Sequence, residues 1–417
     1  MNTGIITGAG LVLLCASAAA PAVILVDDTD GALGATRAPV ISPVKLSRSH
    51  QRAAVEGRLQ LRELPPTDSF AGLAVPAQLF ARSQSDAPAQ LCWLMPPGVR
   101  GQRRFELRTV GRVTGMKVVS ATKAGGQFEI SEAGRPVLRY NYATIEPGDL
   151  LEKVTPANRI YTRARSDYIH PLFGLDGEQL TLDWPQDHPH HRGIYWAWPE
   201  VDWRGQRGDL HALQFVFARP TGRCLVTSGP VFAQIEAENV WQWEGGESLV
   251  QERAVIRAYR ATSVGRLIDL EFQFTALKEP VLLARRDTDK YGGLNLRFAK
   301  VLEQAITFHT DDSNAMPRMA WAELSGRFGD AVPCGIVVLQ HAANPDYPGD
   351  WVKFPEINWF QPTFPASGTR YELRKGEPLV LRFRLWLHRG AKADEPNYAS
   401  QWRAYNVTSA PASFGNR

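Results

Sequence analysis

The chain has 417 residues, of which 44% are hydrophobic and 22% charged, with a formal net charge of +4. This length exceeds what one ordinary hydrophobic core holds, so we expect two packed units. The small basic surplus is scattered along the chain. Without a block of Lys and Arg residues, the sequence predicts no nucleic-acid partner.

The N-terminal segment is apolar. Residues 1–26 contain no charged side chain, and Ile5 to Ala20 have the composition of the hydrophobic part of an export signal. The small residues of Ala20-Pro21-Ala22 fit a cleavage site, so we predict a signal peptide over residues 1–22. The chain would then be exported to the periplasm or the cell exterior, or stay anchored by this segment if it is not cleaved. No later stretch has the roughly 18 uninterrupted apolar residues of a membrane span, so we expect no transmembrane segment in the mature chain.

Residues 40–122 predict a small β-sandwich module. Turn residues separate four short strands, which we expect at Gly57–Glu63, Leu73–Ala81, Gln90–Met95 and Arg103–Val110. The following Lys123-Ala124-Gly125-Gly126 is typical of a boundary between units.

Residues 126–390 predict a large two-sheet structure. Apolar and polar residues alternate over Ile268–Phe274 and over Leu381–Leu387, which indicates strands with one buried and one wet face. No window shows a sustained helical stripe, and we therefore expect an all-β protein. Residues 391–417 form a polar tail, with one short helix expected around Tyr398–Tyr405.

The residues most suggestive of chemistry form a histidine-rich block. Three of the nine histidines fall within Asp187–Gly193. Histidine titrates nearest neutrality, so such a block suits proton transfer or metal ligation. Extended backbone would place His188 and His190 on one face and His191 on the other, although the intervening proline favours a loop or a sheet edge. A turn and return of the chain would bring the upstream His170 beside His188 and His190.

Further polar candidates stand where strands open into loops, which is where functional side chains are often displayed. His341 and Asn344 follow an apolar strand, and Arg286 and Tyr291 lie in a charged run that leads into two glycines. His211 precedes another expected strand, and its role is ambiguous from the sequence.

These blocks, in this order, resemble a bacterial family labelled PmoA-like or "methane oxygenase PmoA". The likeness covers about Arg159–Gly390 and rests on His170-Pro171-Leu172, Asp187–Gly193 with the Trp pair that follows, Tyr291-Gly292-Gly293-Leu294, and His341 with Asn344-Pro345. It implies an exported protein encoded near sugar-degradation genes, with a galactose-mutarotase-like supersandwich over residues 126–390. The methane-oxygenase label does not fit, because that enzyme subunit spans the membrane several times.

A second likeness points to the same fold. Phe354–Asn358, Phe364-Pro365 and Lys375–Glu377 are similar to the C-terminal segment of aldose epimerases. Where those enzymes carry their catalytic carboxylate, this chain offers Gln340, His341 and Asn344. The likeness therefore implies the fold of a mutarotase without its general base.

Three functional hypotheses remain open. In the first, His170, His188 and His190 exchange protons with a sugar or keto-glycoside, with Asp187 orienting an imidazole, in an epimerisation, an elimination or a hydrolysis. The substrate-binding residues would be His191, Arg192, Trp196, Arg286, Tyr291, His341 and Asn344. In the second, His170, His188 and His190 bind one divalent metal ion. In the third, the protein binds carbohydrate or serves as a structural module without catalysis.

Overall fold

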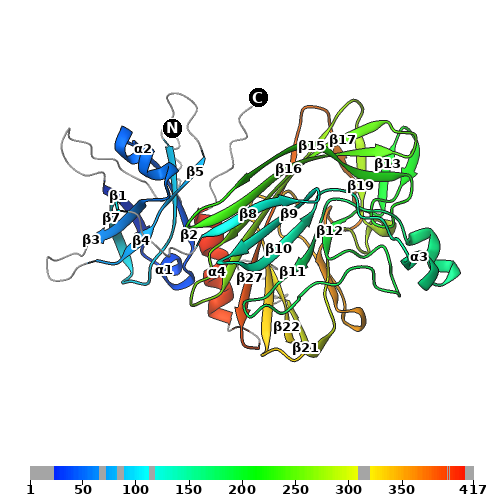
Figure 1. The fold of residues 1–417 in the computed structure, drawn as a ribbon. Helices are drawn as coiled ribbons and strands as arrows, with labels where there is room; N and C mark the ends of the chain where they lie inside the picture. Colours follow the sequence, from blue (N-terminus) through cyan, green and yellow to red (C-terminus); the bar gives the residue numbers. More distant parts are fainter. Residues whose placement is uncertain are drawn as a thin grey trace, which may run out of the picture. The chain divides into compact units, whose positions relative to one another are not determined.

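The computed structural model describes residues 23–64, 72–81, 89–111, 118–308, 320–391, 393 and 395–408 (Figure 1). The expected signal peptide over residues 1–22 lies outside these residues. The protein is all-β, as the alternation predicted, with 54% strand, 11% helix and several antiparallel sheets. It divides into unit 1 (Met1–Val118, Gly229–Phe232 and Asp394–Arg417) and unit 2 (Val119–Ser228 and Ala233–Ala393).

Unit 1 contains two small antiparallel sheets. The first has the strand order β1 (Val23–Asp28), β7 (Gly101–Thr109), β3 (Leu59–Leu64) and β4 (Ala74–Pro76). The second has the order β2 (Pro39–Val44), β6 (Ala89–Leu94) and β5 (Gln78–Ala81). The four strands predicted between residues 57 and 110 are present as β3, as β4 with β5, as β6 and as β7. Strand β1 precedes the expected start of this module.

The described part of unit 1 also contains three helices: α1 (Ala32–Thr36), α2 (Arg48–Val55) and α4 (Glu395–Thr408). Helix α2 begins after Ser47, whose hydroxyl accepts a hydrogen bond from the His50 backbone N–H at 3.2 Å, a common way to cap a helix. Helix α4 is the helix expected around Tyr398–Tyr405. Its Ala404 joins the hydrophobic core of the unit with Leu61, Trp93 and Phe105.

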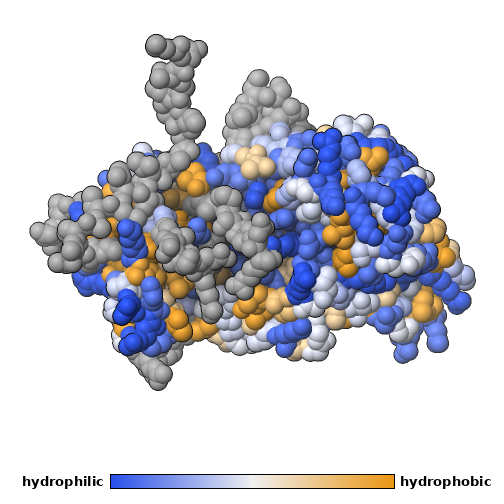
Figure 2. Space-filling view, turned by 90° about the horizontal axis from the view of Figure 1, so that it is seen from above, coloured by the Kyte–Doolittle hydropathy of each residue, from blue (hydrophilic) through white to orange (hydrophobic). Residues whose placement is uncertain are grey.

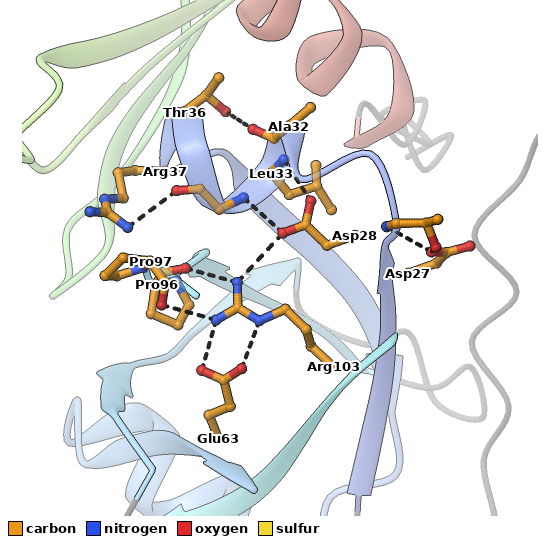
Figure 3. Close-up of polar contacts among 12 residues, drawn as sticks. Asp27, Asp28, Ala32, Leu33, Thr36, Arg37, Glu63, Pro96, Pro97 and Arg103 are labelled. Atoms are coloured by element: carbon orange, nitrogen blue, oxygen red, sulfur yellow. Dashed lines mark hydrogen bonds and ion pairs between the residues drawn. The ribbon is translucent and has the colours of Figure 1, made fainter. Parts of the chain in front are cut away.

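The buried Arg103 connects two strands and one helix of unit 1 through ion pairs and hydrogen bonds (Figure 3). The Arg103 guanidinium on β7 donates to both carboxylate oxygens of Glu63 on β3, at 2.6 and 2.7 Å. It also pairs with Asp28 at 3.5 Å, and Asp28 in turn accepts the backbone N–H groups of Leu33 and Gly34 in α1. The same guanidinium thus joins two strands and the helix that follows β1.

Unit 2 is built on two eight-stranded sheets. The first, which we call the site sheet, has the order β24 (Trp351–Phe354), β25 (Trp359–Pro362), β20 (Gly293–Arg297), β12 (Ile194–Ala197), β11 (Tyr168–Leu172), β10 (Arg135–Asn141), β9 (Gln127–Glu132) and β8 (Val119–Ala124). The second, the long-strand sheet, has the order β15 (Val216–Thr227), β16 (Phe232–Trp243), β17 (Ser248–Tyr259), β18 (Arg266–Ala276), β27 (Leu379–Arg389), β23 (Cys334–Gln340), β22 (Trp321–Phe328) and β21 (Val301–Phe308).

Smaller elements lie at the margins of unit 2. A four-stranded sheet has the order β14 (Gln206–Gly208), β13 (Glu200–Trp203), β19 (Val281–Ala284) and β26 (Tyr371–Leu373). Helix α3 (Leu150–Lys153) and three short 3₁₀ turns, η1 (Pro156–Tyr161), η2 (Arg286–Thr288) and η3 (Pro355–Ile357), lie in connections.

The two large sheets form a sandwich with one shared core. Side chains of the site sheet, such as Trp196 and Leu296, belong to the same buried cluster as Phe272, Phe274 and Phe383 of the long-strand sheet. The alternation predicted over Ile268–Phe274 and Leu381–Leu387 places the apolar members of these strands in this core, as expected for sheets packed face to face.

None of the described helices is long and apolar enough to cross a membrane. On the face drawn in Figure 2, hydrophilic residues predominate and hydrophobic residues lie scattered among them. Scattered apolar residues are normal on a protein surface.

Candidate functional site

The side chains of β12 point alternately into the sandwich core and towards the candidate site. Ile194 and Trp196 point into the sandwich core, whereas Tyr195 and Ala197 form a separate buried cluster with Tyr168 of β11 on the other face of the site sheet. Successive side chains of a strand point to opposite faces. The aromatic run after the histidine block therefore contributes to both faces.

The neighbouring strands extend this outer face. Tyr195 is paired with Asn295, and Arg297 is paired with Trp359, in the registers of β12 with β20 and of β20 with β25. Leu296, between Asn295 and Arg297, belongs to the core instead. Tyr195, Asn295, Arg297 and Trp359 therefore line the outer face of the site sheet.

Residues 183–192, which we call the histidine loop, close on themselves beside this face. Asp183 and Arg192 form an antiparallel bridge and an ion pair across the two ends of the loop. The Arg192 guanidinium lies over the rings of Trp184 and Tyr168, 3.5 and 4.5 Å from their centroids. These contacts fix where the loop leaves the sheet and where it returns.

Gly193 brings the loop back into β12. Its φ of 65° lies in the left-handed region, and a Cβ there would come within 2.3 Å of the Ile169 carbonyl oxygen. Its N–H donates to the Leu182 carbonyl and its own carbonyl accepts from the Arg297 N–H, each at 2.8 Å. Only glycine combines this conformation with so close an approach.

Four imidazole rings meet at this place: His188, His190 and His191 from the histidine loop, and His211 from the connection between β14 and β15. We call them the histidine cluster. Ring centroids lie 4.6 Å apart for His190 and His211, 4.7 Å for His190 and His191, and 4.8 Å for His188 and His191. One nitrogen each of His190, His191 and His211 lies within 4.8 Å of the others.

The partly buried His190 and the buried His191 and His211 are uncharged at neutral pH. Burial lowers the pKa of His190 to about 3, and positive charge on His188, Arg165 and Arg297 adds to this effect. Burial likewise lowers the pKa of His191 and of His211 well below the ordinary range. Taking a charged imidazole out of water is costly, so these rings keep a free lone pair.

The nitrogens of His211 and His190 differ in their hydrogen-bond partners. The Tyr195 hydroxyl lies 3.1 Å from His211 Nδ1, and the two rings are parallel within 4°. His190 differs, because its Nδ1 is buried and has no hydrogen-bond partner among the described residues. Such an atom costs free energy unless something satisfies it, by about 1–3 kcal/mol.

His188 is the accessible member of the cluster. Its side chain is 44% exposed, and its Nδ1 lies 3.0 Å from Asp187 Oδ2. Asp187 also accepts from Arg297 Nη2 with both oxygens, at 3.0 and 2.9 Å. Burial alone would raise the pKa of Asp187, but the hydrogen bonds from His188 and Arg297 lower it. The carboxylate is thus a charged anchor for one nitrogen of His188.

Partly exposed aromatic and polar side chains lie next to the cluster. The ring of Tyr161 lies 5.3 Å from that of His190, and the ring of Tyr291 lies 5.3 Å from that of His211. Arg286 donates to Asp209 at 2.6 Å and to the Tyr291 hydroxyl at 3.3 Å. The predicted pair Arg286 and Tyr291 therefore lies at the histidine cluster.

His170 lies outside the histidine cluster. It sits on β11, where its Nδ1 is 3.0 Å from the Thr181 hydroxyl, and none of the ring contacts among the described residues joins it to another histidine. The metal ligands expected from the sequence were His170, His188 and His190, whereas the nitrogens that gather belong to His190, His191 and His211. The chain after β11 turns and pairs back on it through Phe173 with Gln179. This return places Thr181, and not the histidine loop, beside His170.

Arg192 and Trp196 do not fit the substrate-binding roles expected of them. Arg192 is fully buried and its guanidinium is engaged by Asp183, Tyr168 and Trp184. Trp196 borders a small pocket, but its ring is stacked on Trp198 at 4.6 Å and meets core phenylalanines edge-on. A ring covered in this way cannot stack on a sugar, because its place on β12 turns it into the core.

His341 and Asn344 follow β23 of the long-strand sheet. The Asn344 Nδ2 donates to the Arg382 carbonyl and its Oδ1 accepts the Arg382 N–H, each at 2.8 Å, which joins this connection to β27. His341 Nδ1 accepts from the Ala343 N–H, and burial lowers the pKa of His341 to about 4. Neither residue is among the ring contacts of the histidine cluster that the described residues make.

The sequence patterns do not identify several residues of the site. These are Arg165, Tyr195, Arg297 and Trp359, together with His211, whose role the sequence leaves ambiguous. Arg165 lies over the Tyr195 ring at 4.2 Å and donates to the carbonyl of His211. Period-two alternation could have indicated Tyr195 and Arg297, but only the strand pairing shows that they share a face.

Comparison with known proteins places the chain in a family. The model of a family of unknown function, DUF6807, matches residues 127–403, which is more than half of the chain. The protein therefore belongs to this family, and the histidine cluster lies inside the matched region. Among curated proteins, no match to this chain is found.

Proposed function

We propose that the histidine cluster is the active site of a carbohydrate-acting enzyme in which His188 transfers protons to and from the substrate. The proposal rests on two linked contacts: Arg297 donates to the Asp187 carboxylate, and the same carboxylate holds Nδ1 of His188. An imidazole held at one nitrogen by a carboxylate and open at the other is suited to general acid–base catalysis.

A carbohydrate is the substrate class that the surroundings favour. Sugars present C–H faces that pack on aromatic rings and hydroxyl groups that bond to forked donors and carboxylates. Tyr161 and Tyr291 supply partly exposed rings, and Arg286 with Asp209 supplies a charged donor and acceptor beside them. The resemblance to the PmoA-like family, found near sugar-degradation genes, supports the same class.

The chemistry available to His188 covers three related reactions. A base can remove a C–H proton that a neighbouring carbonyl acidifies. Return of a proton to the same face by the resulting acid gives exchange, and protonation of the other face by water gives epimerisation. Alternatively, the acid can protonate a departing glycosidic oxygen, which gives elimination or, with water, hydrolysis. The buried rings of His190 and His191 are too depressed in pKa to hold a proton for these steps.

The test is turnover of a panel of glycosides and 3-keto-glycosides in D₂O, followed by proton NMR. Deuterium at a ring carbon would report C–H removal, a new alkene signal elimination, and a free reducing end hydrolysis. We expect one of these signals with the natural sequence and a loss of about 10²–10⁴-fold in rate for His188→Gln.

The control is His50→Gln, which removes a histidine of unit 1 that is not part of the cluster. It should retain the rate of the natural sequence. Full turnover by His188→Gln would overturn the assigned role. Saturable sugar binding without any turnover would leave a carbohydrate-binding protein in place of an enzyme.

A further inference from the structure

We propose that His190, His191 and His211 together hold one divalent transition-metal ion, with a coordination position left open towards His188. The inference rests on the proposed function only in placing the reaction at this cluster. It differs from the set expected from the sequence, because His170 is replaced by His191 and His211.

The geometry is close to that of a three-histidine site. Zinc binds imidazole nitrogens at about 2.0–2.1 Å, and three such ligands with an open position are typical of catalytic zinc. In a tetrahedral site these nitrogens would be roughly 3.4 Å apart. Those of His190, His191 and His211 lie within 4.8 Å, so modest ring rotations complete the site.

One nitrogen of the cluster lacks a partner that a metal would supply. An imidazole binds an ion only through an unprotonated nitrogen. The Nδ1 of His190 is buried and has no hydrogen-bond partner among the described residues, and the buried His191 and His211 lie beside it. A bound ion would satisfy this nitrogen.

Tyr195 and Arg165 hold the ring of His211, the third expected ligand, in place. Metal-binding histidines usually bond through their other nitrogen to a partner that fixes the ring. The Tyr195 hydroxyl occupies that position for His211, at 3.1 Å from Nδ1, and Arg165 lies over the Tyr195 ring. His211 is thereby left with its Nε2 to offer.

The ligand atoms that are available at the cluster indicate the kind of metal it binds. Arg297 lies 3.4 Å from His191 Nδ1, which is longer than an ordinary hydrogen bond, and its charge is balanced by Asp187. Asp187 and Asp209 are both engaged by arginines. Imidazole nitrogens therefore supply the ligands, and this donor set suits Zn²⁺, Co²⁺, Ni²⁺ or Cu²⁺ better than Mg²⁺ or Ca²⁺.

The experiment uses the full chain, stripped of metal with a chelator and then titrated with Co²⁺ and Zn²⁺ by calorimetry. We expect one ion per chain, visible cobalt absorption bands of a nitrogen-rich site, and no response to Mg²⁺. His190→Gln and His211→Gln should abolish the uptake, and circular dichroism checks that each variant is folded.

Tyr195→Phe guards against variants that fail to fold, because it keeps the ring and removes only the hydroxyl that orients His211. It should weaken cobalt binding about 10–100-fold. His188→Gln should bind the ion normally. Absence of stoichiometric uptake by the natural sequence, or uptake that persists in both His190→Gln and His211→Gln, would overturn the inference.

The two proposals fail in different ways. Stoichiometric cobalt binding without any sugar turnover would sustain the metal site and remove the proposed function. Turnover that depends on His188 in protein shown to be metal-free would sustain the proposed function and remove the metal site.

Discussion

Asp187 and Arg297 are joined across the site by two contacts of 3.0 and 2.9 Å, and the same carboxylate holds the imidazole of His188. Arg297 is buried on β20, whereas His188 is half-exposed on the histidine loop. The pair therefore connects a rigid strand to the accessible histidine. It explains how a loop residue keeps a defined orientation.

Removing this anchor should impair catalysis. We expect Asp187→Ala to lower kcat/KM by about 10–100-fold, because His188 loses its orienting partner. Thermal unfolding measures the separate cost of leaving the Arg297 guanidinium, which is 5% exposed, without its carboxylate, so the activity is expressed per folded molecule. Asp176→Ala, which removes an exposed carboxylate paired with Arg389, is the matched control. An equal loss of activity in both variants would contradict the orienting role.

Gly193 should be intolerant of a side chain. Gly193→Ala adds the strain of a left-handed conformation, about 1–2 kcal/mol, and a Cβ that meets the Ile169 carbonyl oxygen. Gly205→Ala is the control, because its φ is 74° and its Cβ would meet nothing within 4 Å. Chemical unfolding should show a larger loss of stability for Gly193→Ala, together with loss of activity. Equal losses would mean that the close approach to Ile169 is unimportant.

A buried acid should make the stability of unit 2 depend on pH. Burial and the negative charge of Asp167 raise the pKa of Glu252 well above 4.5. The stability contributed by its protonated form is complete below the unfolded value and is lost as the pH rises through the folded one. Glu252→Gln should therefore become more stable relative to the natural sequence as the pH rises from 5 to 8, while still accepting the hydrogen bond from Trp241.

Urea unfolding at several pH values measures this difference. Glu129→Gln, at an exposed site on β9, should show no such trend. A difference between Glu252→Gln and the natural sequence that stays constant with pH would show that Glu252 is ionised in the folded protein.

Arg103 should be essential to the stability of unit 1. Arg103→Met leaves Glu63 and Asp28 without their cation, and breaking a buried pair in this way costs about 3–5 kcal/mol. Arg108→Met, on the same strand but in an exposed pair with Glu106, should cost less than about 1 kcal/mol. Denaturant unfolding of both variants makes the comparison, and similar losses would contradict the role of the buried network.

Much of the architecture follows from local sequence patterns. The alternation over Ile268–Phe274 was enough to predict a strand and its buried face. Apolar side chains at every second position are buried together only when the segment is extended and that face is covered. The spacing argument from extended backbone, which set His191 apart from His188 and His190, was wrong, because residues 187–192 form a loop in which the three rings meet. The all-β class follows from these patterns without any tertiary information.

The composition of the site depends on contacts that no local pattern specifies. All four residues of β12 are buried, on one face of the site sheet or the other. The sequence therefore does not show which face is the core, with Trp196 facing the core and Tyr195 facing the histidines. His211 joins the cluster from a distant connection. Likewise, the length of chain between His170 and His188 did not reveal that the chain first returns along β11 with Thr181 beside His170, and that the histidine loop then closes on Asp183 and Arg192.

The central claim is that chemistry occurs on the outer face of the site sheet, at His188, and not at His341 of the long-strand sheet. The most direct measurement compares the turnover of one substrate by His188→Gln and His341→Gln, with each rate expressed per folded molecule. We expect His188→Gln to lose turnover and His341→Gln to keep most of it. Loss confined to His341→Gln would contradict the account and move the active site to the other sheet.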